Sequence, residues 1–573
     1  MQAAESLHTA RRERLADSAF IFALVAASAA LYLPFLGFYS DDWSFLWYVQ
    51  MGGPTMSLAD IYSRTFFLTN SIITRPVHAV YAATLLALFG DQPLGHHLVN
   101  TAMLGAGAVL YYRLLLALGI SRSFALATAI VWALLPHYAT VRYWFVCIQI
   151  PLSFVGYAVS LLADLRAAAE RPEFRSKWRL VSATGLFVSV MSYEIFMPLF
   201  LLSPLLVAWR QRAMAGGGPL PWREHVPFAV LQLAILVGCG IYKAVFTARM
   251  RPAELADHFE FFGRLVFDAA AVTVAGDFGV GLPRVLADIL GRHEVGWAVA
   301  AAGLCGIVVF AWLMRALRSE AASFDRSAYL PLVIAAAVIF VGGYSIFFIT
   351  FNAGITSTGI SNRIGLASSL GIALGLVAIL GRLVSLLRSV AARKFVFAGV
   401  VAVVAAAGFL IVNVIGFYWG EAWLRQQAVL ASLAKAVPQL RPGSTVLLDG
   451  VCPYVGPSVV FDSWWDTAGA VRLQYRDSSL AADVVSPRLR VTEEGIYTAN
   501  WGERHGPYAY GSLLIYDYRR GTVEALSGPL DASRYFLKWN PGRDSGCRSF
   551  EEGKGERLFV AGGPVSRFPP SLR

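Results

Sequence analysis

Two adjacent carboxylates stand in the segment Phe38–Trp47, which reads FYSDDWSFLW and follows the first long apolar run of the chain. A carboxylate placed near a reacting hydroxyl can take its proton as a general base. Neighbouring side chains diverge in helices and in strands, so Asp41 and Asp42 are not expected to converge on one atom. We expect one of them to be a base, with a slight preference for Asp41, which lies closer to the apolar run. The other is expected to orient a loop or to cap the helix that follows, because aspartate is a favoured cap.

Basic side chains beside other apolar runs could hold a phosphate group. Arg363 follows a short loop of small polar residues and begins an apolar run. An arginine in this position can bind a phosphate through two parallel hydrogen bonds, or it can extend towards lipid headgroups. Arg75, Lys243 and Arg142 also lie near the ends of apolar runs and are further candidates for a phosphate contact.

Glu194 lies at the tip of a hairpin with apolar sequence on both sides. An acidic residue close to membrane depth is costly, so a site role is the first hypothesis for it. Glu194 could bind a substrate hydroxyl or pair with an arginine, and the sequence leaves both open. Other polar and aromatic residues assigned to the same side of the membrane are candidate substrate contacts: His96, His97, His137, Tyr143, Trp144 and Asn362. The histidines lack the spacing of a metal site, which favours a hydrogen-bonding role.

These candidates are carried by a strongly apolar chain. Hydrophobic residues make up 57% of the sequence and charged residues only 15%, with a mean hydropathy of +0.56. Soluble domains average about 25% charged residues. Repeated apolar runs of about 20 residues therefore predict a polytopic helical membrane protein. The net charge of +11 resides in short loops between the runs, which favours a role in membrane orientation and gives no reason to expect nucleic-acid binding.

Eleven apolar runs are predicted to span the membrane, from Ser18–Phe38 to Phe395–Tyr418. The arginines that precede the first run predict a cytoplasmic N-terminus, and the odd number of spans then places the C-terminal region outside. The first run is too long for a signal-peptide core and has no small-residue cleavage site after it. Long outer loops are expected at residues 39–95 and 247–294. Within the first of them, Val77–Phe89 is too short to span comfortably, so an interfacial or re-entrant helix is expected.

The sequence predicts two domains, a membrane domain of residues 1–419 and an extracytoplasmic domain of residues 420–573. In the second, Ser444–Leu448, Ser512–Tyr516 and Arg557–Val560 are typical of strands, so an α/β or β-rich fold is expected. Several of its segments, including FDSWWD, combine aromatic and acidic residues; they could face a carbohydrate or be ordinary turns around a small core.

The five cysteines fall into two groups. Cys452 and Cys547 are expected to form a disulfide if this domain faces an oxidising compartment. Cys147, Cys239 and Cys305 lie in or beside apolar runs and are expected to be core residues.

The chain resembles the GT-C superfamily of membrane glycosyltransferases over about residues 15–385, and three sequence motifs carry this resemblance. They are Ser40-Asp41-Asp42-Trp43 in the first outer loop, the block from Arg75-Pro76 through Leu88-Phe89-Gly90 to His96-His97-Leu98-Val99-Asn100, and Leu135-Pro136-His137 followed by Val141-Arg142-Tyr143-Trp144. None of these motifs is specific alone, and their order and shared outer location carry the resemblance.

The resemblance implies an inverting enzyme of a bacterial inner membrane. Such an enzyme moves a sugar from a polyprenyl-phosphate carrier to a hydroxyl of a cell-envelope glycan or glycolipid on the outer face. It implies an aspartate base, an arginine such as Arg363 on the carrier phosphate, and no metal cofactor. Two other functions stay open, a transporter or flippase of lipid-linked saccharides and a non-catalytic scaffold that binds glycan. Transporters are often built from internal repeats, and none is seen here, which favours the enzyme.

Overall fold

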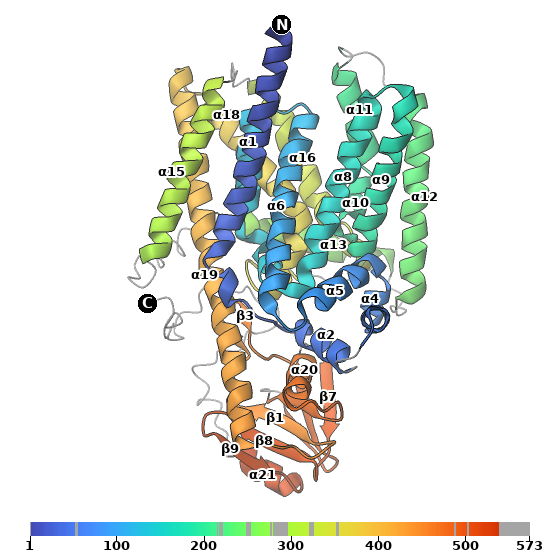
Figure 1. Ribbon diagram of the computed structural model, residues 1–573, viewed down its shortest axis with the longest axis vertical. Helices are drawn as coiled ribbons and strands as arrows, with labels where there is room; N and C mark the ends of the chain where they lie inside the picture. The colour runs from blue at the N-terminus through green and yellow to red at the C-terminus, as the bar shows by residue number, and fades with distance from the viewer. Residues whose placement is uncertain are drawn as a thin grey trace.

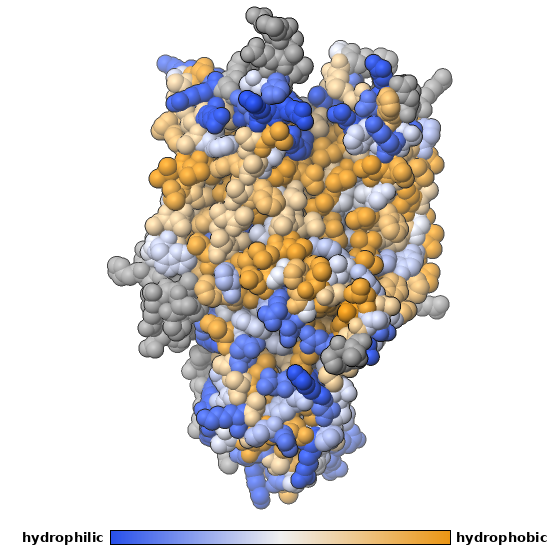
Figure 2. Space-filling view, in the orientation of Figure 1, coloured by the Kyte–Doolittle hydropathy of each residue, from blue (hydrophilic) through white to orange (hydrophobic). Residues whose placement is uncertain are grey.

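The computed structural model describes residues 2–51, 56–214, 216, 222–247, 254–274, 278, 296–319, 326–350, 354–485, 489–500 and 503–537. Long helices form a bundle, and a smaller domain that contains the strands lies at the end of the bundle far from the N-terminus (Figure 1). On the face shown in Figure 2, a broad apolar band crosses the bundle, and hydrophilic residues gather at both of its ends. The chain is therefore a multi-pass membrane protein with a β-rich C-terminal region, as the sequence predicts.

The bundle is built from long helices interrupted by short ones. They are α1 (Gln2–Ala30), α6 (Pro93–Ala117), α7 (Arg122–Leu134), α8 (Gln149–Ala169), α9 (Pro172–Ser192), α10 (Met197–Phe200), α11 (Ser203–Met214), α12 (Trp222–Phe246), α13 (Leu255–Ala270), α15 (Gly296–Ser319), α16 (Arg326–Tyr344), α17 (Phe347–Thr350), α18 (Leu366–Val384) and α19 (Val390–Ala436). Short 3₁₀ segments are η1 (Leu33–Phe35), η2 (Pro136–Arg142), η3 (Phe145–Ile148), η4 (Glu194–Phe196) and η7 (Ile360–Gly365).

All eleven predicted apolar runs fall on helices, but the count of eleven spans is not confirmed. Among the described residues, six helices are long and apolar enough to cross a membrane, or seven if α7 and η2, bent by 60°, form one span. The predicted run at residues 195–209 is divided between α10 and α11. Pro204 lies at the start of α11, where a proline can begin a helix but cannot continue one from the preceding turn.

Four helices fill the predicted outer loop at residues 39–95. They are α2 (Asp41–Gln50), α3 (Leu58–Phe66), α4 (Asn70–Ile73) and α5 (Pro76–Phe89). They lie at the end of the bundle that faces the C-terminal domain (Figure 1). We call this end the α2 end, and the opposite end, where the N-terminus lies, the basic end, because the predicted cytoplasmic arginine loops lie there. The predicted short helix at Val77–Phe89 is confirmed as α5.

The C-terminal domain contains a four-stranded sheet in the order β4-β1-β8-β9. Its strands are β1 (Thr445–Asp449), β4 (Ala481–Val484), β8 (Leu513–Asp517) and β9 (Thr522–Ala525). The central strand β1 is parallel to both neighbours and buried along its whole length, as expected for a parallel strand covered on both faces.

The smaller elements of this domain are β2 (Tyr454–Val455), β3 (Ser458–Val459), β5 (Arg490–Val491), β6 (Ile496–Asn500), β7 (Glu503–Tyr508), α20 (Trp464–Tyr475) and α21 (Pro529–Leu537). The predicted strands Ser444–Leu448 and Ser512–Tyr516 are confirmed as β1 and β8. The predicted strand Arg557–Val560 lies outside the described residues.

The C-terminal domain is attached to the bundle in two ways. The helix α19 has 47 residues and runs without a break through the predicted domain boundary at residue 420. In addition, α20 packs directly on α2: a Cβ atom at Gly469 would lie 2.7 Å from the carbonyl oxygen of Trp43, so only glycine allows this approach. Ser44 Oγ donates to the Trp465 carbonyl at 2.5 Å. The C-terminal domain therefore rests on the helix that carries the acidic pair.

At the basic end, Asp17 joins four helices. Its carboxylate is fully buried and accepts hydrogen bonds from Arg122 Nε at 2.6 Å, Tyr112 Oη at 2.7 Å and Trp312 Nε1 at 3.0 Å. A buried carboxylate is stable only when it is paired and hydrogen-bonded, and Asp17 has both kinds of partner. We call this group the Asp17 cluster; it ties α1 to α6, α7 and α15.

Candidate functional site

Asp42 is fully buried, and its side chain is committed to the backbone. Its Oδ2 atom accepts a hydrogen bond from the Tyr39 amide at 2.9 Å, and its Oδ1 atom accepts one from the Val146 amide at 2.9 Å. These bonds hold the turn before α2 against η3. Ser40, within that turn, has a φ of 48°, which is uncommon and costly for a residue other than glycine. The turn that presents the acidic pair is thus a strained one, held in place by Asp42.

Asp41 is the first residue of α2, and its carboxylate differs from that of Asp42 in exposure and in hydrogen bonding. It is only partly buried, and among the described residues no hydrogen bond reaches it. Burial raises the pKa of Asp41 to about 6; the positive charge of Arg363 lowers this pKa and the negative charge of Asp462 raises it. A carboxylate with an unoccupied acceptor oxygen and a pKa near neutrality is suited to general-base catalysis.

Arg363 lies in η7 and is held near Asp41 by two contacts. Its Nη1 donates to the Ile360 carbonyl at 2.6 Å, and its guanidinium carbon lies 5.2 Å from the centre of the Trp144 ring. Trp144 is fixed in turn, because its Nε1 donates to the Tyr39 carbonyl at 2.9 Å. Within the described residues, Arg363 forms no ion pair with a carboxylate. The structure therefore brings Arg363, Trp144 and Asp41 close to one another at the α2 end.

Arg75, Glu194 and Lys243 form a second group beside the first. Glu194 accepts from Arg75 Nη2 at 2.5 Å, from Arg75 Nε at 3.1 Å and from Lys243 Nζ at 3.1 Å. Burial alone would raise the pKa of Glu194, but the charges of Arg75 and Lys243 lower it well below its ordinary value. Glu194 thus pairs with an arginine, which is one of its two predicted roles. Two cations and one carboxylate leave this group with one net positive charge.

Tyr193 links the two groups, and the sequence analysis did not single it out. The Arg75 guanidinium carbon lies 4.4 Å from the centre of its ring. Burial raises the pKa of the Tyr193 hydroxyl, and the charges of Arg75, Glu194 and Arg363 all act on it. Both arginines therefore lie close to this ring. Its position next to Glu194 in the sequence was the one signal that could have drawn attention to it.

Asp462 is a second residue that the sequence analysis missed as a site residue, although it belongs to the FDSWWD segment. Its Oδ2 accepts from the Tyr454 hydroxyl at 2.7 Å. It lies two residues before α20, which packs on α2, and Trp465 Nε1 donates to Ser40 Oγ at 3.4 Å. The C-terminal domain therefore places a carboxylate close enough to Asp41 to influence its pKa.

The histidines lie in the packed interior. His96 and His97 are fully buried, and their Nε2 atoms lie 3.0 Å from the Gly90 carbonyl oxygen and 2.8 Å from that of Gly37. His137 is 8% exposed and stacks on the ring of Phe278 at 5.0 Å. All three lie in packed surroundings, and among the described residues no hydrogen bond joins any of them to Asp41.

Three other candidates are also occupied elsewhere. Arg142 is 3% exposed, and its guanidinium donates to the Ala133 carbonyl and to Ser28 Oγ. Asn362 bridges η7 to η2, since its Nδ2 donates to the Pro136 carbonyl at 3.2 Å. The buried Tyr143 donates its hydroxyl to the Val412 carbonyl at 2.5 Å. These contacts hold the elements that carry the site, and we leave the three residues out of the group that meets substrate.

No group of three metal-binding side chains is found among the described residues. Cys452 is disulfide-bonded, but Cys547 lies outside the described residues, so their pairing stays a prediction. Cys147, Cys239 and Cys305 are free and buried.

The arrangement can be compared with known proteins. No protein-family model matches the chain, and no curated protein matches it. Among solved structures it is similar to ArnT from Cupriavidus metallidurans bound to undecaprenyl phosphate, with 13% identity and a TM-score of 0.36 over 82% of this chain and 86% of that one. The apo crystal structure of the same ArnT gives 14% identity and a TM-score of 0.35, over 82% and 87%. A likeness at this level carries no argument about activity, which has to come from the site itself.

Proposed function

We propose that the protein is an inverting membrane glycosyltransferase with a polyprenyl-phosphate-linked sugar as donor and a cell-envelope glycan or glycolipid hydroxyl as acceptor. The observation that carries the proposal is the Asp41 carboxylate, which lacks a hydrogen-bond partner in the described structure and lies close enough to Arg363 at the α2 end to feel its charge. An uncommitted carboxylate beside a cation, both at the end of a membrane bundle, fits a base and a phosphate site for a lipid-linked substrate.

In the proposed reaction, Asp41 accepts the proton of the acceptor hydroxyl. At the same time, the oxygen of this hydroxyl attacks the anomeric carbon of the sugar. The bond between this carbon and the carrier phosphate oxygen breaks, and the bonding electrons leave with polyprenyl phosphate. A single displacement from the opposite face inverts the anomeric configuration. The products are the glycosylated acceptor, a protonated Asp41 that later returns its proton to solvent, and the free carrier.

The leaving phosphate gains negative charge during this step, and cations held in advance stabilise it most. Arg363 is held by the Ile360 carbonyl and the Trp144 ring. The group of Arg75, Glu194 and Lys243 supplies one more net positive charge beside it. We assign Arg363 to the phosphate directly and this second group to the electrostatic stabilisation of the same phosphate. Tyr193 lies near both arginines and belongs to the same proposed phosphate site.

The C-terminal domain is assigned to the acceptor side. Asp462 and Tyr454 are bound to each other, and they reach the α2 end through the packing of α20 on α2. A carboxylate and a phenol are suitable hydrogen-bond partners for sugar hydroxyl groups. This placement leaves the bundle side of Asp41, with Arg363, for the donor.

The test is transfer by the full-length protein in proteoliposomes. Radiolabelled sugars on a panel of polyprenyl-phosphate carriers are offered together with envelope glycan and glycolipid extracts, and the product linkage is analysed by NMR. We expect one donor to be consumed and the anomeric configuration to be inverted. Retained configuration would overturn the single displacement. Movement of the intact lipid-linked sugar to the other leaflet, without transfer, would favour a flippase.

A further inference from the structure

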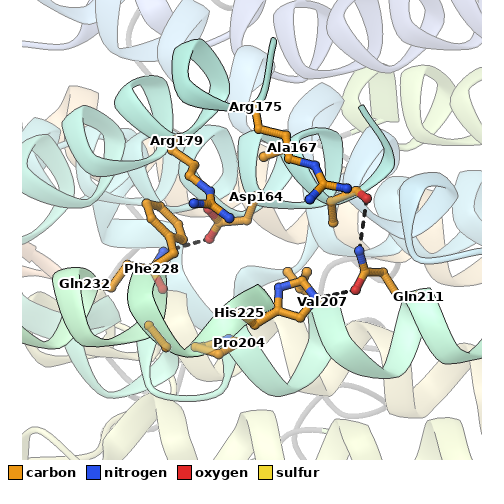
Figure 3. A pocket seen from close by; sticks show the side chains of 12 residues that line it. Asp164, Ala167, Arg175, Arg179, Pro204, Val207, Gln211, His225, Phe228 and Gln232 are labelled. Atoms are coloured by element: carbon orange, nitrogen blue, oxygen red, sulfur yellow. Dashed lines mark hydrogen bonds between the residues drawn. The ribbon is translucent and has the colours of Figure 1, made fainter. Parts of the chain in front are cut away.

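A pocket lies at the basic end, far from Asp41, between α8, α9, α11 and α12. Its cavity volume is about 30 Å³, and the pocket is partly open to its surroundings. In α11, Arg210 lies between two residues of the pocket lining, Val207 and Gln211, and donates to the Ala117 carbonyl at the end of α6. This contact places the pocket at the same end of the bundle as the Asp17 cluster. The residues around it are Asp164, Ala167, Ala168, Arg175, Arg179, Pro204, Val207, Gln211, His225, Phe228, Ala229 and Gln232 (Figure 3).

Basic side chains outnumber acidic ones in this pocket. Arg175 and Arg179 reach into it from α9, and His225 faces them from α12 (Figure 3). Among the described residues of the lining, Asp164 carries the one carboxylate, which accepts from Gln232 Nε2 at 2.7 Å. With a neutral histidine the lining therefore carries one net positive charge, and a protonated histidine would make it two.

The polar side chains are held in place before any ligand arrives. Gln211 donates its Nε2 to the Ala168 carbonyl at 2.9 Å and is hydrogen-bonded through its Oε1 to His225. Arg175 Nε donates to the Glu170 carbonyl at 3.0 Å. The guanidinium carbon of Arg179 lies 5.3 Å from the ring centre of Phe228. Side chains that are already oriented lose less conformational entropy when an anion binds between them.

The outer surface beside the pocket is apolar. On α11, Leu205 and Trp209 are 52% and 54% exposed, and on α12 Val226 and Val230 are 50% and 59% exposed. Exposed apolar side chains on a membrane helix face lipid chains, and a tryptophan near the end of such a helix is typical of the headgroup layer. A cationic pocket thus adjoins a lipid-facing surface at the depth where phospholipid headgroups lie.

We propose that this pocket binds the phosphate headgroup of an anionic membrane phospholipid, with Arg175 and Arg179 on the phosphate and the acyl chains along the exposed faces of α11 and α12. Basic pockets between membrane helices are suited to such headgroups. The apolar surface favours a lipid over a soluble phosphate, because only a lipid has acyl chains that can pack on this surface. The proposal does not depend on the transferase activity, because the pocket and Asp41 lie at opposite ends of the bundle.

The test measures lipid retention by the full-length protein in native mass spectrometry. Phosphatidylglycerol and phosphatidylcholine with the same acyl chains compete for the wild type, for the double variant Arg175→Gln/Arg179→Gln and for Arg175→Gln alone. Arg166→Gln is the matched control, because Arg166 is an arginine of the same end that lies outside the pocket lining, with a side chain 65% exposed. We expect the wild type to prefer phosphatidylglycerol and each pocket arginine to contribute about tenfold to this preference. Arg166→Gln should leave the preference unchanged.

Two results would overturn the proposal. One is equal retention of the two lipids by the wild type. The other is competition by inorganic phosphate at the affinity of the lipid, which would assign the pocket to a soluble anion. Because Arg179 also lies near Asp164 and its loss could weaken the fold, a photoactivatable phosphatidylglycerol is added to the unmodified wild type. Crosslinks should map to residues 226–233 of α12, and crosslinks spread evenly over the bundle would contradict the site.

Discussion

The two ends of the bundle use the same side chains for different purposes. At the basic end, the carboxylate of Asp17 meets Arg122, Tyr112 and Trp312 and has hydrogen bonds to all three. At the α2 end, the carboxylate of Asp41 also lies near an arginine, but no hydrogen bond reaches it within the described structure. The first arrangement satisfies a buried charge and stabilises the fold. The second leaves the charge available to a substrate.

Asp42 shows that this difference does not follow from position in the sequence. It is the immediate neighbour of Asp41, yet its two oxygens are bound to backbone amides, as completely as those of Asp17 are bound to side chains. Hydrogen-bond satisfaction therefore separates Asp17 and Asp42 from the proposed base, Asp41, where local sequence does not. The predictions below change one side of this contrast at a time.

The largest effect is expected from Asp41→Asn compared with Asp42→Asn. If Asp41 is the base, its replacement should lower the transfer rate by about 10²- to 10⁴-fold. It should also raise the stability above pH 6. The pKa of Asp41 in the folded protein, about 6, exceeds the ordinary value of 3.8, so the unfolded chain ionises first and stability falls between these pH values. The uncharged asparagine escapes this loss.

Asp42→Asn should do the opposite. An amide can accept from only one of the two backbone N–H groups, so about 1–3 kcal/mol of stability should be lost. The folded fraction should transfer sugar faster than Asp41→Asn does. Transfer assays and thermal unfolding of both variants make the comparison. If Asp42→Asn were the stable, inactive variant, the roles of the two carboxylates would be exchanged.

A stability effect without a catalytic one is expected from Asp17→Ala. The change leaves Arg122 without its main partner in a site where its side chain is only 12% exposed, and should cost about 3–5 kcal/mol. Unfolding can be followed with a thiol-reactive dye, because Cys147, Cys239 and Cys305 are free and buried. Glu13→Ala is the matched control: Glu13 is a more exposed partner of Arg122 and should contribute less than about 1 kcal/mol. A loss of transfer in the folded Asp17 variant would contradict the separation of the two ends.

The sequence predicts most of the fold because long apolar runs and arginine-rich loops are strong signals. Every predicted run falls on a helix, and the strands at Thr445–Asp449 and Leu513–Asp517 lie where alternating residues place them. The number of spans is not fixed in the same way. The pair α10 and α11 shows why, since a run that is continuous in composition is broken in the backbone at Pro204. Nor does hydropathy indicate that α19 continues for 17 residues into the predicted C-terminal domain, from Gly420 to Ala436.

The sequence indicates the site residues that the bundle contributes. It does not indicate the contact that the C-terminal domain makes with them. Arg75, Glu194 and Lys243 are far apart in sequence, but each is a charged residue beside an apolar run, and the topology alone assigns them to one end. Asp462 offers no such signal, because its approach to Asp41 depends on how α20 packs on α2. That packing requires glycine at position 469, which looks like any other helix residue in the sequence.

Arg363 should matter more for the donor than for stability. Arg363→Gln removes the proposed phosphate contact and should lower kcat/KM for the donor by about 10- to 100-fold, since a charge-assisted pair of hydrogen bonds is lost. Arg363→Lys should recover only part of this, because lysine keeps the charge but cannot bind with two parallel N–H groups. Steady-state kinetics at varied donor concentration measure both variants. Arg388→Gln, at an exposed arginine outside the site, should change nothing. Full recovery by lysine would contradict bidentate binding.

The smallest effect tests whether the C-terminal domain acts on the base. The acidic limb of the pH profile of kcat/KM should have its midpoint near pH 6, because Asp41 must be ionised to accept a proton. The negative charge of Asp462 raises this pKa, so Asp462→Asn should move the midpoint to lower pH, by less than about one unit. Tyr454→Phe is the matched control, since it removes the hydrogen bond to Asp462 and keeps the charge. If both variants shift the limb equally, the effect comes from disturbed packing; if only Asp462→Asn shifts it, the charge of the C-terminal domain reaches Asp41 directly.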